Sequence, residues 1–428
     1  MFYSNNLQEI ELEFEKIGHN GISIGYFNNK VVFAYGILPG EIAKIKILKE
    51  KKNLIEGELL EIVKKSPHRI LEEENHYLSC SPWQTFNYNF QIEIKKQILN
   101  EIFKKFSKFE INLEKFFPAN KISGYRTKIE YSFLEENNIL YYAFYKRGSF
   151  AQKIKLQNGC FLISDNANKL ALKLLEEINK KSLKEAKGLI IRKSHYFNDM
   201  HFALFIKDKN YNFSFNNKEL AGFSLIYSNP KISINKIDEI LKEEGQNYIR
   251  EKILNLEFRY PYTSFFQNNI ELFEEVLKIM KKHANSCIKL VDLYCGVGVI
   301  GLSIGGEKII GIDNDENAIK YTKLNALLNN IKNFEGIFLR SEKISEEFLK
   351  NTDILILDPP RVGLHSKLIK LILKTKPQNI FYLSCNPVTQ ARDFVLLKDY
   401  YELINIYGFD FYPQTPHIES LIILKIKK

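Results

Sequence analysis

The chain has 428 residues, 45% hydrophobic and 26% charged, which is ordinary for a soluble globular protein of two to four domains. No run approaches the roughly 18 apolar residues of a membrane span, and the N-terminus does not resemble a signal peptide, so we expect a cytoplasmic protein without membrane contact. The net charge of +10 favours a polyanionic partner, although the lysine-rich codon usage of an AT-rich genome gives the same excess.

The cysteines do not form a recognisable framework. Five are scattered along the chain without a Cys-x-x-Cys pair: Cys80, Cys160, Cys287, Cys295 and Cys385. We therefore expect neither disulfides nor a metal site.

Residues 8–64 have the pattern of short strands. "EIELEFEKIG" alternates apolar and charged residues with period two, and Asn28-Asn29 separates two apolar runs as in a hairpin. Two lysine-rich strands follow, making five. Five short strands with basic faces predict a barrel of the OB type, a common binder of single-stranded nucleic acid, or a generic all-β module.

The middle of the chain is mixed. Residues 66–84 read as a linker, and residues 87–106 as an amphipathic helix whose apolar side chains recur every four residues. From about 120 to 260 the pattern is α+β, with a hairpin that turns near Asn137-Asn138.

That hairpin region interleaves basic residues and tyrosines. Arg126, Lys128, Lys146 and Arg147 lie among the aromatic residues. Arginine pairs with phosphate and aromatic rings stack on splayed bases, so the pattern favours RNA binding. A solvated strand face explains it equally well.

From residue 270 onward, apolar strands alternate with helices. This alternation predicts a parallel sheet with crossover helices. The predicted strands are "IKLVDLYCG", "KIIGIDND", "FEGIFLR", "TDILILDPP", "NIFYLSC", "YELINIYGFD" and "SLIILKIKK".

The first of these strands runs into a glycine-rich turn. Gly296, Gly298 and Gly301 fit G-x-G-x-x-G, in which small residues let the backbone approach a cofactor at a helix start. Asp313 ends the next strand and could accept both hydroxyls of a ribose. Enzymes that use NAD and enzymes that use S-adenosylmethionine both fit these two features.

The fourth strand separates the two classes. Asp358 ends it and is followed by two prolines that stiffen the turn. An acid-Pro-Pro motif at this point is typical of methyltransferases that act on bases. A simple strand-ending turn is the alternative.

The fifth strand ends at Cys385. Carbon 5 of a pyrimidine becomes nucleophilic when a thiolate adds to carbon 6, and a base must later remove the carbon-5 proton. Cys385 is the candidate nucleophile, and Glu419, at the start of the last apolar strand, is the candidate base. A packing cysteine and an exposed acid are the alternatives. "TQARD" predicts the start of the next helix, with Thr389 or a nearby polar group as its cap.

The motifs together resemble the RNA uracil-5-methyltransferases that carry a TRAM domain. "GISIGYFNNKVVFAYGILPGE" looks like the TRAM barrel, and "SPHR" like its boundary. "YRTKIEYSF" and "FYKRGS" are similar to the central RNA-facing domain. "SFFQNN", "DLYCGVG", "DPPR", "SCNP" and "HIES" match the catalytic motifs in order. The resemblance covers nearly the whole chain.

The resemblance implies roles for individual residues. Gln267, Tyr294, Gly296 and Asp313 match contacts to S-adenosylmethionine, and Asp358 lies near the methyl donor and the target base. Cys385 matches the nucleophile, and Glu419 the base. Arg126, Lys128 and Arg147 are expected on the RNA-binding surface. The family often has asparagine where this chain has Val299.

Many relatives hold a [4Fe–4S] cluster on four cysteines. This chain offers only Cys80 in the region after the barrel, and Cys160 matches the distant fourth ligand. Two cysteines cannot supply four thiolates, so no iron–sulfur cluster is expected.

The resemblance also implies a multidomain α/β architecture. A TRAM barrel occupies residues 1–66, a central α+β RNA-binding domain residues 67–265, and a Rossmann-like methyltransferase domain residues 266–428, with helix 87–106 packed on the last. The expected protein is a monomer that methylates a uridine in RNA, with 23S ribosomal RNA as the expected substrate. Transfer RNA is the alternative substrate. An RNA cytosine-5-methyltransferase, a non-catalytic RNA-binding assembly factor and an NAD enzyme are the rival classes.

Overall fold

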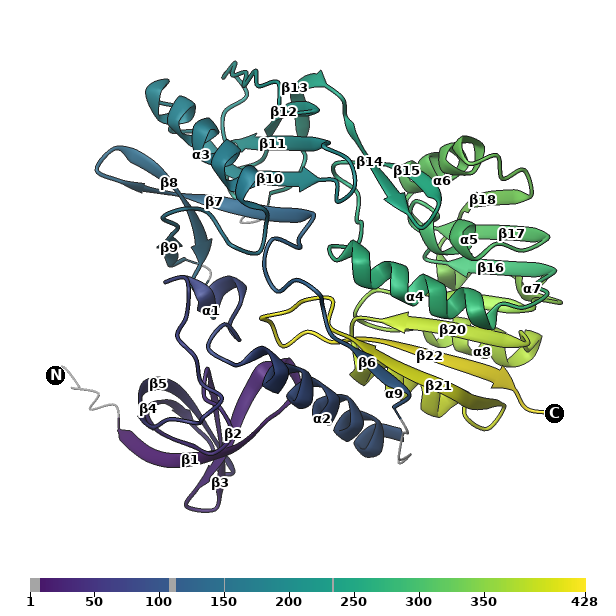
Figure 1. Cartoon of the computed structure of the whole chain (residues 1–428), viewed down its shortest axis with the longest axis horizontal. Helices are drawn as coiled ribbons and strands as arrows, with labels where there is room; N and C mark the ends of the chain where they lie inside the picture. Colours follow the sequence, from purple (N-terminus) through teal and green to yellow (C-terminus); the bar gives the residue numbers. More distant parts are fainter. Residues whose placement is uncertain (1–7, 108–112, 150, 233–234) are drawn as a thin grey trace. The chain divides into compact units, whose positions relative to one another are not determined.

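The computed structural model (Figure 1) describes residues 8–107, 113–149, 151–232 and 235–428. It divides into two compact units. The first contains the chain up to Glu101 together with Tyr412–His417, and the second contains Ile102–Phe411 and Ile418–Lys428. The three-domain division with boundaries at residues 66 and 265 stays a prediction. No helix in the described ranges is long and apolar enough to cross a membrane.

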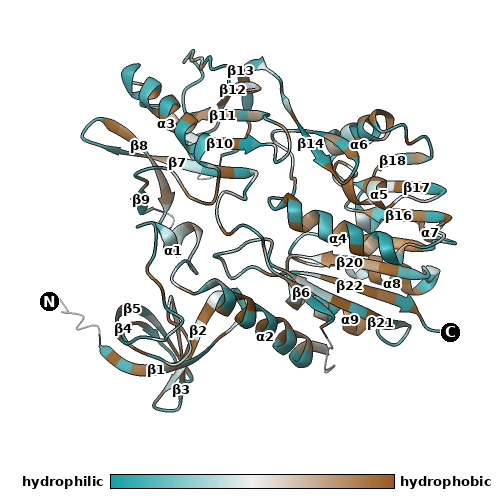
Figure 2. Ribbon diagram, viewed as in Figure 1, coloured by the Kyte–Doolittle hydropathy of each residue, from teal (hydrophilic) through white to brown (hydrophobic). Residues whose placement is uncertain are grey.

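The first unit contains a closed five-stranded barrel in the order β1-β2-β3-β5-β4, which confirms the five predicted strands. Asn28 and Asn29 both have positive φ, as the predicted β2–β3 turn requires. Apolar and charged residues alternate along β1 (Figure 2), and the apolar ones fill the interior. The elements are β1 (Glu9–Ile17), η1 (His19–Gly21), β2 (Ile22–Phe27), β3 (Lys30–Tyr35), β4 (Glu41–Glu50) and β5 (Leu54–Lys64).

Residues 66–84 are folded, so their prediction as a linker is wrong. The Arg69 guanidinium forms two contacts of 2.6 Å with the carboxylate of Glu41, which is fully buried on β4. Trp83 is also buried, after the short helix α1 (Tyr77–Cys80). Individual side-chain contacts order this segment, and such contacts leave no periodic signal in the sequence. The following helix α2 (Tyr88–Ser107) confirms the predicted amphipathic helix.

A seven-stranded sheet in the order β13-β12-β11-β10-β7-β8-β9 begins the second unit. Asn137 and Asn138 have positive φ at the β7–β8 turn, which confirms the predicted hairpin. Helix α3 packs on β8, where Tyr142 donates a 2.8 Å hydrogen bond to the Ala171 carbonyl. The elements are β7 (Lys128–Glu136), β8 (Ile139–Tyr145), β9 (Lys153–Lys155), α3 (Asp165–Lys180), β10 (Ala186–Lys193), β11 (Met200–Ile206), β12 (Gly222–Tyr227) and β13 (Glu239–Gly245).

An eight-stranded sheet in the order β18-β17-β16-β19-β20-β22-β21-β6 carries the predicted C-terminal strands. All seven predicted strands are present. They are β16 (Lys289–Leu293), β17 (Lys308–Asp313), β18 (Phe334–Phe338), β19 (Ile354–Leu357), β20 (Asn379–Ser384), β21 (Tyr401–Phe409) and β22 (Glu419–Ile426), with β6 (Lys115–Phe117) at the edge. The helices are α4 (Ile270–His283), α5 (Val299–Ile304), α6 (Glu316–Leu328), α7 (Glu346–Leu349), α8 (Ser366–Thr375) and α9 (Pro387–Leu397), with the 3-10 turn η2 (Ser341–Lys343).

One strand, β22, corrects the prediction of a parallel sheet. The first five strands are parallel, but β22 runs antiparallel to both β20 and β21. No helix connects β21 to β22, and a connection without a crossover helix favours an antiparallel pair. The dinucleotide-binding order 3-2-1-4-5-6 has its sixth strand next to the fifth, so this sheet departs from it at β22.

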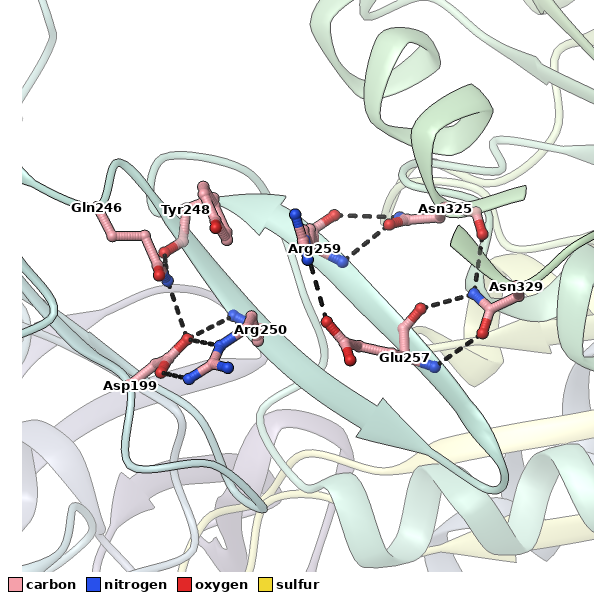
Figure 3. A network of polar contacts seen from close by, with 8 residues as sticks. All are labelled: Asp199, Gln246, Tyr248, Arg250, Glu257, Arg259, Asn325 and Asn329. Carbon is pink, nitrogen blue, oxygen red and sulfur yellow. Dashed lines mark hydrogen bonds and ion pairs between the residues drawn. The ribbon is translucent and has the colours of Figure 1, made fainter. Parts of the chain in front are cut away.

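A two-stranded ribbon, β14 (Tyr248–Ile253) and β15 (Leu256–Pro261), links the two sheets (Figure 3). Arg250 forms a two-point ion pair with Asp199, beside β11. On the other side, Asn325 of α6 and Asn329, the C-cap residue of that helix, form hydrogen bonds with the backbone of β15 as an adjacent strand would. The two asparagine side chains thus satisfy the backbone groups of alternate residues of β15.

Candidate active site

The glycine turn is pinned to the end of the neighbouring strand. The backbone N–H groups of Tyr294 and Cys295 both donate to the Ile312 carbonyl, at 2.9 and 3.2 Å. The Asp313 carboxylate accepts a 2.8 Å hydrogen bond from the Gly296 N–H. The structure therefore brings three predicted residues, Tyr294, Gly296 and Asp313, together at the carboxyl edge of the sheet, where ligands bind in α/β folds.

The glycines of the turn have different surroundings. A side chain at Gly296 would meet nothing within 4 Å, whereas one at Gly298 would come within 2.3 Å of Thr322. One at Gly301 would come within 2.9 Å of Asp292. Gly296 therefore faces open space, and the other two glycines permit close packing. Val299 begins α5 and is buried, so it offers no polar group there.

Asp292 is a site residue that our sequence reasoning missed. It is buried within β16, and its Oδ2 accepts a 2.8 Å hydrogen bond from the Gly301 N–H. Its Oδ1 is buried without a hydrogen-bond partner in the described residues. Burial, together with the charges of Asp358 and Asp313, raises the pKa of Asp292 to about 8, although the Gly301 hydrogen bond opposes the rise. The sequence does mark this residue, because an acid stands inside the apolar run "KLVDL".

A cavity of about 540 Å³ opens beside the turn. Tyr294 lines it from the glycine turn, and Pro360 and Gly363 line it from the loop after Asp358. Its size lies in the range typical of small-molecule sites. The cavity can accept a ligand at the end of the sheet.

Strand register sets Cys385 opposite Glu419. Ser384, the last residue of β20, pairs with Ser420 of β22. Because the two strands are antiparallel, the next pair outward is Cys385 and Glu419. Cys385 is partly exposed, and Glu419 is only 3% exposed. The reversal of β22 therefore creates the pairing of the two predicted catalytic residues.

Gln390, which is buried on α9, forms hydrogen bonds with both β20 and β22 and so holds the two strands in this register. Its side-chain amide donates to the carbonyls of Tyr382 on β20 (2.9 Å) and Ser420 on β22 (3.1 Å). Its carbonyl oxygen accepts from the Ser420 hydroxyl at 2.6 Å. Sequence reasoning missed this residue, because a polar residue on an unplaced helix gives no sign of its partners.

Asn386 connects two motifs. Its Oδ1 accepts from the Val388 N–H at 3.2 Å and caps α9, so Thr389 is not the cap. Pro387 follows at the first helical position, which suits proline because that position has no hydrogen-bonded N–H. The Asn386 Nδ2 donates to the Arg361 carbonyl at 2.9 Å. The Asn-Pro pair after the cysteine thus starts the helix and holds the loop that carries Asp358.

The charges around Cys385 are mostly acidic. Burial, together with the charges of Glu419 and Asp358, raises the pKa of the thiol to about 11, although the charge and a side-chain hydrogen bond of Arg361 oppose the rise. Burial, together with Asp358, raises the pKa of Glu419 well above its usual range, and Arg361 again opposes this. Burial raises the pKa of Asp358 to about 7. Arg361 is therefore a cation that opposes the acids of this site. Its place directly after "DPP" in the sequence could have identified it as a site residue.

Gln267 lies before α4. Its carbonyl accepts a 3.1 Å hydrogen bond from the Thr127 hydroxyl, and the neighbouring Asn268 side chain accepts from the Lys128 N–H at 3.0 Å. Gln267 is 6% exposed, whereas Phe265 is 70% exposed and presents a bare aromatic ring. The contact between Gln267 and the cofactor stays a prediction.

The basic residues expected to bind RNA flank the β7–β8 hairpin. Arg126 and Lys128 precede and begin β7, and Arg147 follows β8; all three are partly exposed. Burial lowers the pKa of Lys128, and Arg192 adds to this effect. Their role in RNA binding stays a prediction.

Comparison with known proteins agrees with this geometry. The family model described as "tRNA (Uracil-5-)-methyltransferase" matches residues 87–427, and the TRAM domain model matches residues 4–60. The chain belongs to the tRNA (uracil-5-)-methyltransferase family. It is therefore an S-adenosylmethionine-dependent RNA methyltransferase of the uracil-5 type with a TRAM domain.

Two relatives and one solved structure match nearly the whole chain. An "uncharacterized RNA methyltransferase" from Lactobacillus johnsonii is 30% identical over 100% of this chain and 99% of its own. Another, from Aquifex aeolicus, is 30% identical over 98% and 99%. The crystal structure of the Pyrococcus abyssi tRNA (uracil-54, C5)-methyltransferase with S-adenosyl-L-homocysteine covers 97% of this chain and 100% of its own, at 23% identity and a TM-score of 0.77. This last similarity shows the shared fold.

Proposed function

We propose that this protein methylates carbon 5 of a uridine in RNA through a covalent bond between Cys385 and carbon 6 of the uracil. The observation that carries the proposal is that Ser384 of β20 pairs with Ser420 of β22, which puts Cys385 and Glu419 next to this last pair at the edge of the cofactor-binding sheet. The thiolate adds to carbon 6 and makes carbon 5 nucleophilic. Bound S-adenosylmethionine supplies the methyl group to that carbon. Glu419 then takes the carbon-5 proton, and the thiolate leaves by elimination.

The cofactor fits the turn that holds Tyr294, Gly296 and Asp313. Gly296 faces open space, and the cavity beside Tyr294 has room for a small molecule. In this proposal Asp313 holds the ribose, Gln267 contacts the cofactor from before α4, and Asp358 lies near the methyl donor. The cationic sulfonium would favour the charged form of the nearby acids and of the thiol.

The target uridine must leave its stack to reach the thiol, because a stacked base hides carbon 6. The net charge of +10 and the TRAM barrel supply attraction to RNA. Phe265, exposed two residues before Gln267, is a suitable surface on which a splayed base can stack. In this proposal Arg126, Lys128 and Arg147 contact the RNA, and the enzyme acts as a monomer in the cytoplasm.

Ribosomal 23S RNA is our proposed substrate, and transfer RNA is the second candidate. The resemblance to barrel-carrying enzymes favours ribosomal RNA. One observation favours transfer RNA, because the Pyrococcus abyssi enzyme named for uracil-54 of tRNA covers 97% of this chain. Mass mapping of 5-methyluridine in both RNAs, from cells with and without the gene, separates the two. If cells without the gene keep the modification in both RNAs, the proposal is contradicted.

The rival classes are tested by their own ligands. The antiparallel β22 between β20 and β21 weighs against an NAD enzyme. Affinity for a nicotinamide cofactor without affinity for S-adenosylmethionine would favour that class. Methylation of cytidine in place of uridine would favour a cytosine-5-methyltransferase, and RNA binding without methyl transfer would favour an assembly factor.

A further inference from the structure

Three potential metal ligands meet in the segment after the barrel. The Nε2 atom of His76 lies 3.3 Å from Oε2 of Glu74. One turn of α1 brings Cys80 back over His76, with its Sγ 3.8 Å from the His76 carbonyl oxygen. The ligand atoms of the three residues lie within 4.8 Å of one another. We propose that Glu74, His76 and Cys80 bind a single divalent metal ion, zinc in preference to others.

The spacing and the ligand types fit zinc. Zinc bonds of about 2.0–2.3 Å to carboxylate, imidazole and thiolate put neighbouring ligand atoms roughly 3.3–3.8 Å apart in a tetrahedron. The contact between Glu74 and His76 already has this length, and a small shift of Cys80 completes the set. Zinc accepts this mixture of oxygen, nitrogen and sulfur, and one coordination position remains for water or a further ligand.

Neighbouring side chains already orient the three ligands. Asn75 Oδ1 lies 3.2 Å from His76 Nδ1, which favours a proton on Nδ1 and leaves the Nε2 lone pair facing Glu74. The Gln84 amide donates to Glu74 at 3.1 Å and to the Ser81 hydroxyl at 2.7 Å. That hydroxyl lies 3.0 Å from the Cys80 sulfur. Such outer contacts are typical of the partners that hold metal ligands in place.

Burial gives the ion a structural role. His76 and Gln84 are nearly fully buried, and the Glu74 side chain is 14% exposed. Glu74 and the partly exposed Cys80 both contact His76 here, and a metal ion bound by the three side chains would stabilise the fold of residues 66–84.

An iron–sulfur cluster does not fit this set. A [4Fe–4S] cluster requires four thiolates, and this segment supplies one thiolate, one imidazole and one carboxylate. Cys287 lies just before β16, Cys295 just after β16, and Cys385 just after β20. The search for Cys-x-x-Cys missed the site because its ligands are of three different types.

Metal analysis of the full-length protein tests the proposal. Protein stripped with a chelator and dialysed against zinc should retain one zinc per chain by elemental mass spectrometry. His76→Ala and Cys80→Ser should lose it, and the matched control Cys287→Ser should keep it. Asn75→Ala, which keeps all three ligands, should lower zinc affinity by roughly 10–100-fold. Circular dichroism identifies any variant that fails to fold. If the ligand variants fail to fold, the zinc affinity of Asn75→Ala tests the proposal instead.

Two further readings complete the test. Cobalt in place of zinc should give a thiolate-to-metal charge-transfer band that disappears in Cys80→Ser. Failure of the native protein to retain zinc overturns the proposal, as does stoichiometric iron and sulfide in protein purified without oxygen. None of these measurements uses RNA methylation, so they succeed or fail independently of the proposed function.

Discussion

Two cysteines follow parallel strands of the same sheet and have opposite surroundings. Cys295 lies two residues after β16 and is buried; burial raises its pKa well above the usual range, and Asp292 and Asp313 add to this. Cys385 follows β20 directly, is partly exposed, and has Arg361 to offset the acids. A place at the edge of the sheet therefore does not make a thiol reactive. Access and a neighbouring cation distinguish the two.

Removal of each thiol should give the largest contrast. Cys385→Ala should lower methyl transfer by at least roughly 10⁴-fold, because covalent catalysis has no substitute group at this position. Cys295→Ala should retain most of the activity, with a modest loss of stability from a small cavity. Transfer of radiolabelled methyl from S-adenosylmethionine to RNA measures both. If Cys385→Ala and Cys295→Ala both fold and lose the same activity, the proposed difference in reactivity between the two thiols is wrong.

Removal of the Glu419 carboxylate, the proposed base, should stop the reaction after methyl transfer. Glu419→Gln should lower turnover about 10²–10⁴-fold, the usual contribution of a general base, and should accumulate a methylated covalent adduct. Denaturing gels and mass spectrometry detect the adduct. Glu402→Gln, at an exposed position on β21, is the matched control. Normal turnover by Glu419→Gln would mean that another group takes the proton.

Removal of the cation should make Cys385 more like Cys295. Arg361 lowers the pKa of the Cys385 thiol, so Arg361→Gln should raise it. The thiolate then forms only at higher pH, and at a fixed pH below about 11 alkylation of Cys385 should slow by about tenfold per pKa unit. Iodoacetamide labelling across pH, mapped by mass spectrometry, measures the shift. Arg361→Lys should keep part of the effect, and an unchanged profile for Arg361→Gln would exclude activation by this cation.

The helix cap beyond the nucleophile should have the smallest effect. Asn386→Ala removes the cap of α9 and the bond to the Arg361 carbonyl, which should cost about 1 kcal/mol of stability. Thr389→Ala loses contacts to the same loop but leaves the cap, so it should cost less. Thermal unfolding measures both. A larger loss for Thr389→Ala would favour Thr389 over Asn386 as the cap of α9.

The sequence predicted those parts of the fold that depend on periodicity and turn chemistry. The five barrel strands, the two Asn-Asn hairpins, α2 and the seven C-terminal strands all follow from local patterns. The direction of β22 did not, because an apolar strand reads the same in either direction. Yet that reversal produces the pairing of Cys385 with Glu419.

The residues that support the site could not be predicted from the sequence for a different reason. Gln390 and Asn325 bond partners about thirty residues away in the chain, Ser420 and Val297, and nothing local marks them. Residues 66–84 were misread in the same way. Periodicity detects faces of helices and strands, whereas single buried hydrogen bonds appear only once the fold is known.

The covalent intermediate is the central claim, and trapping it is the most direct test. RNA transcripts of 23S ribosomal RNA and of tRNA, made with 5-fluorouridine, cannot lose the substituent at carbon 5 as a proton, so the adduct should persist. Incubated with the enzyme and S-adenosylmethionine, one of them should form a complex stable to denaturation, in which mass spectrometry places the nucleotide on Cys385. An adduct on another residue, or no adduct with an RNA that the enzyme methylates in its unfluorinated form, would contradict the account.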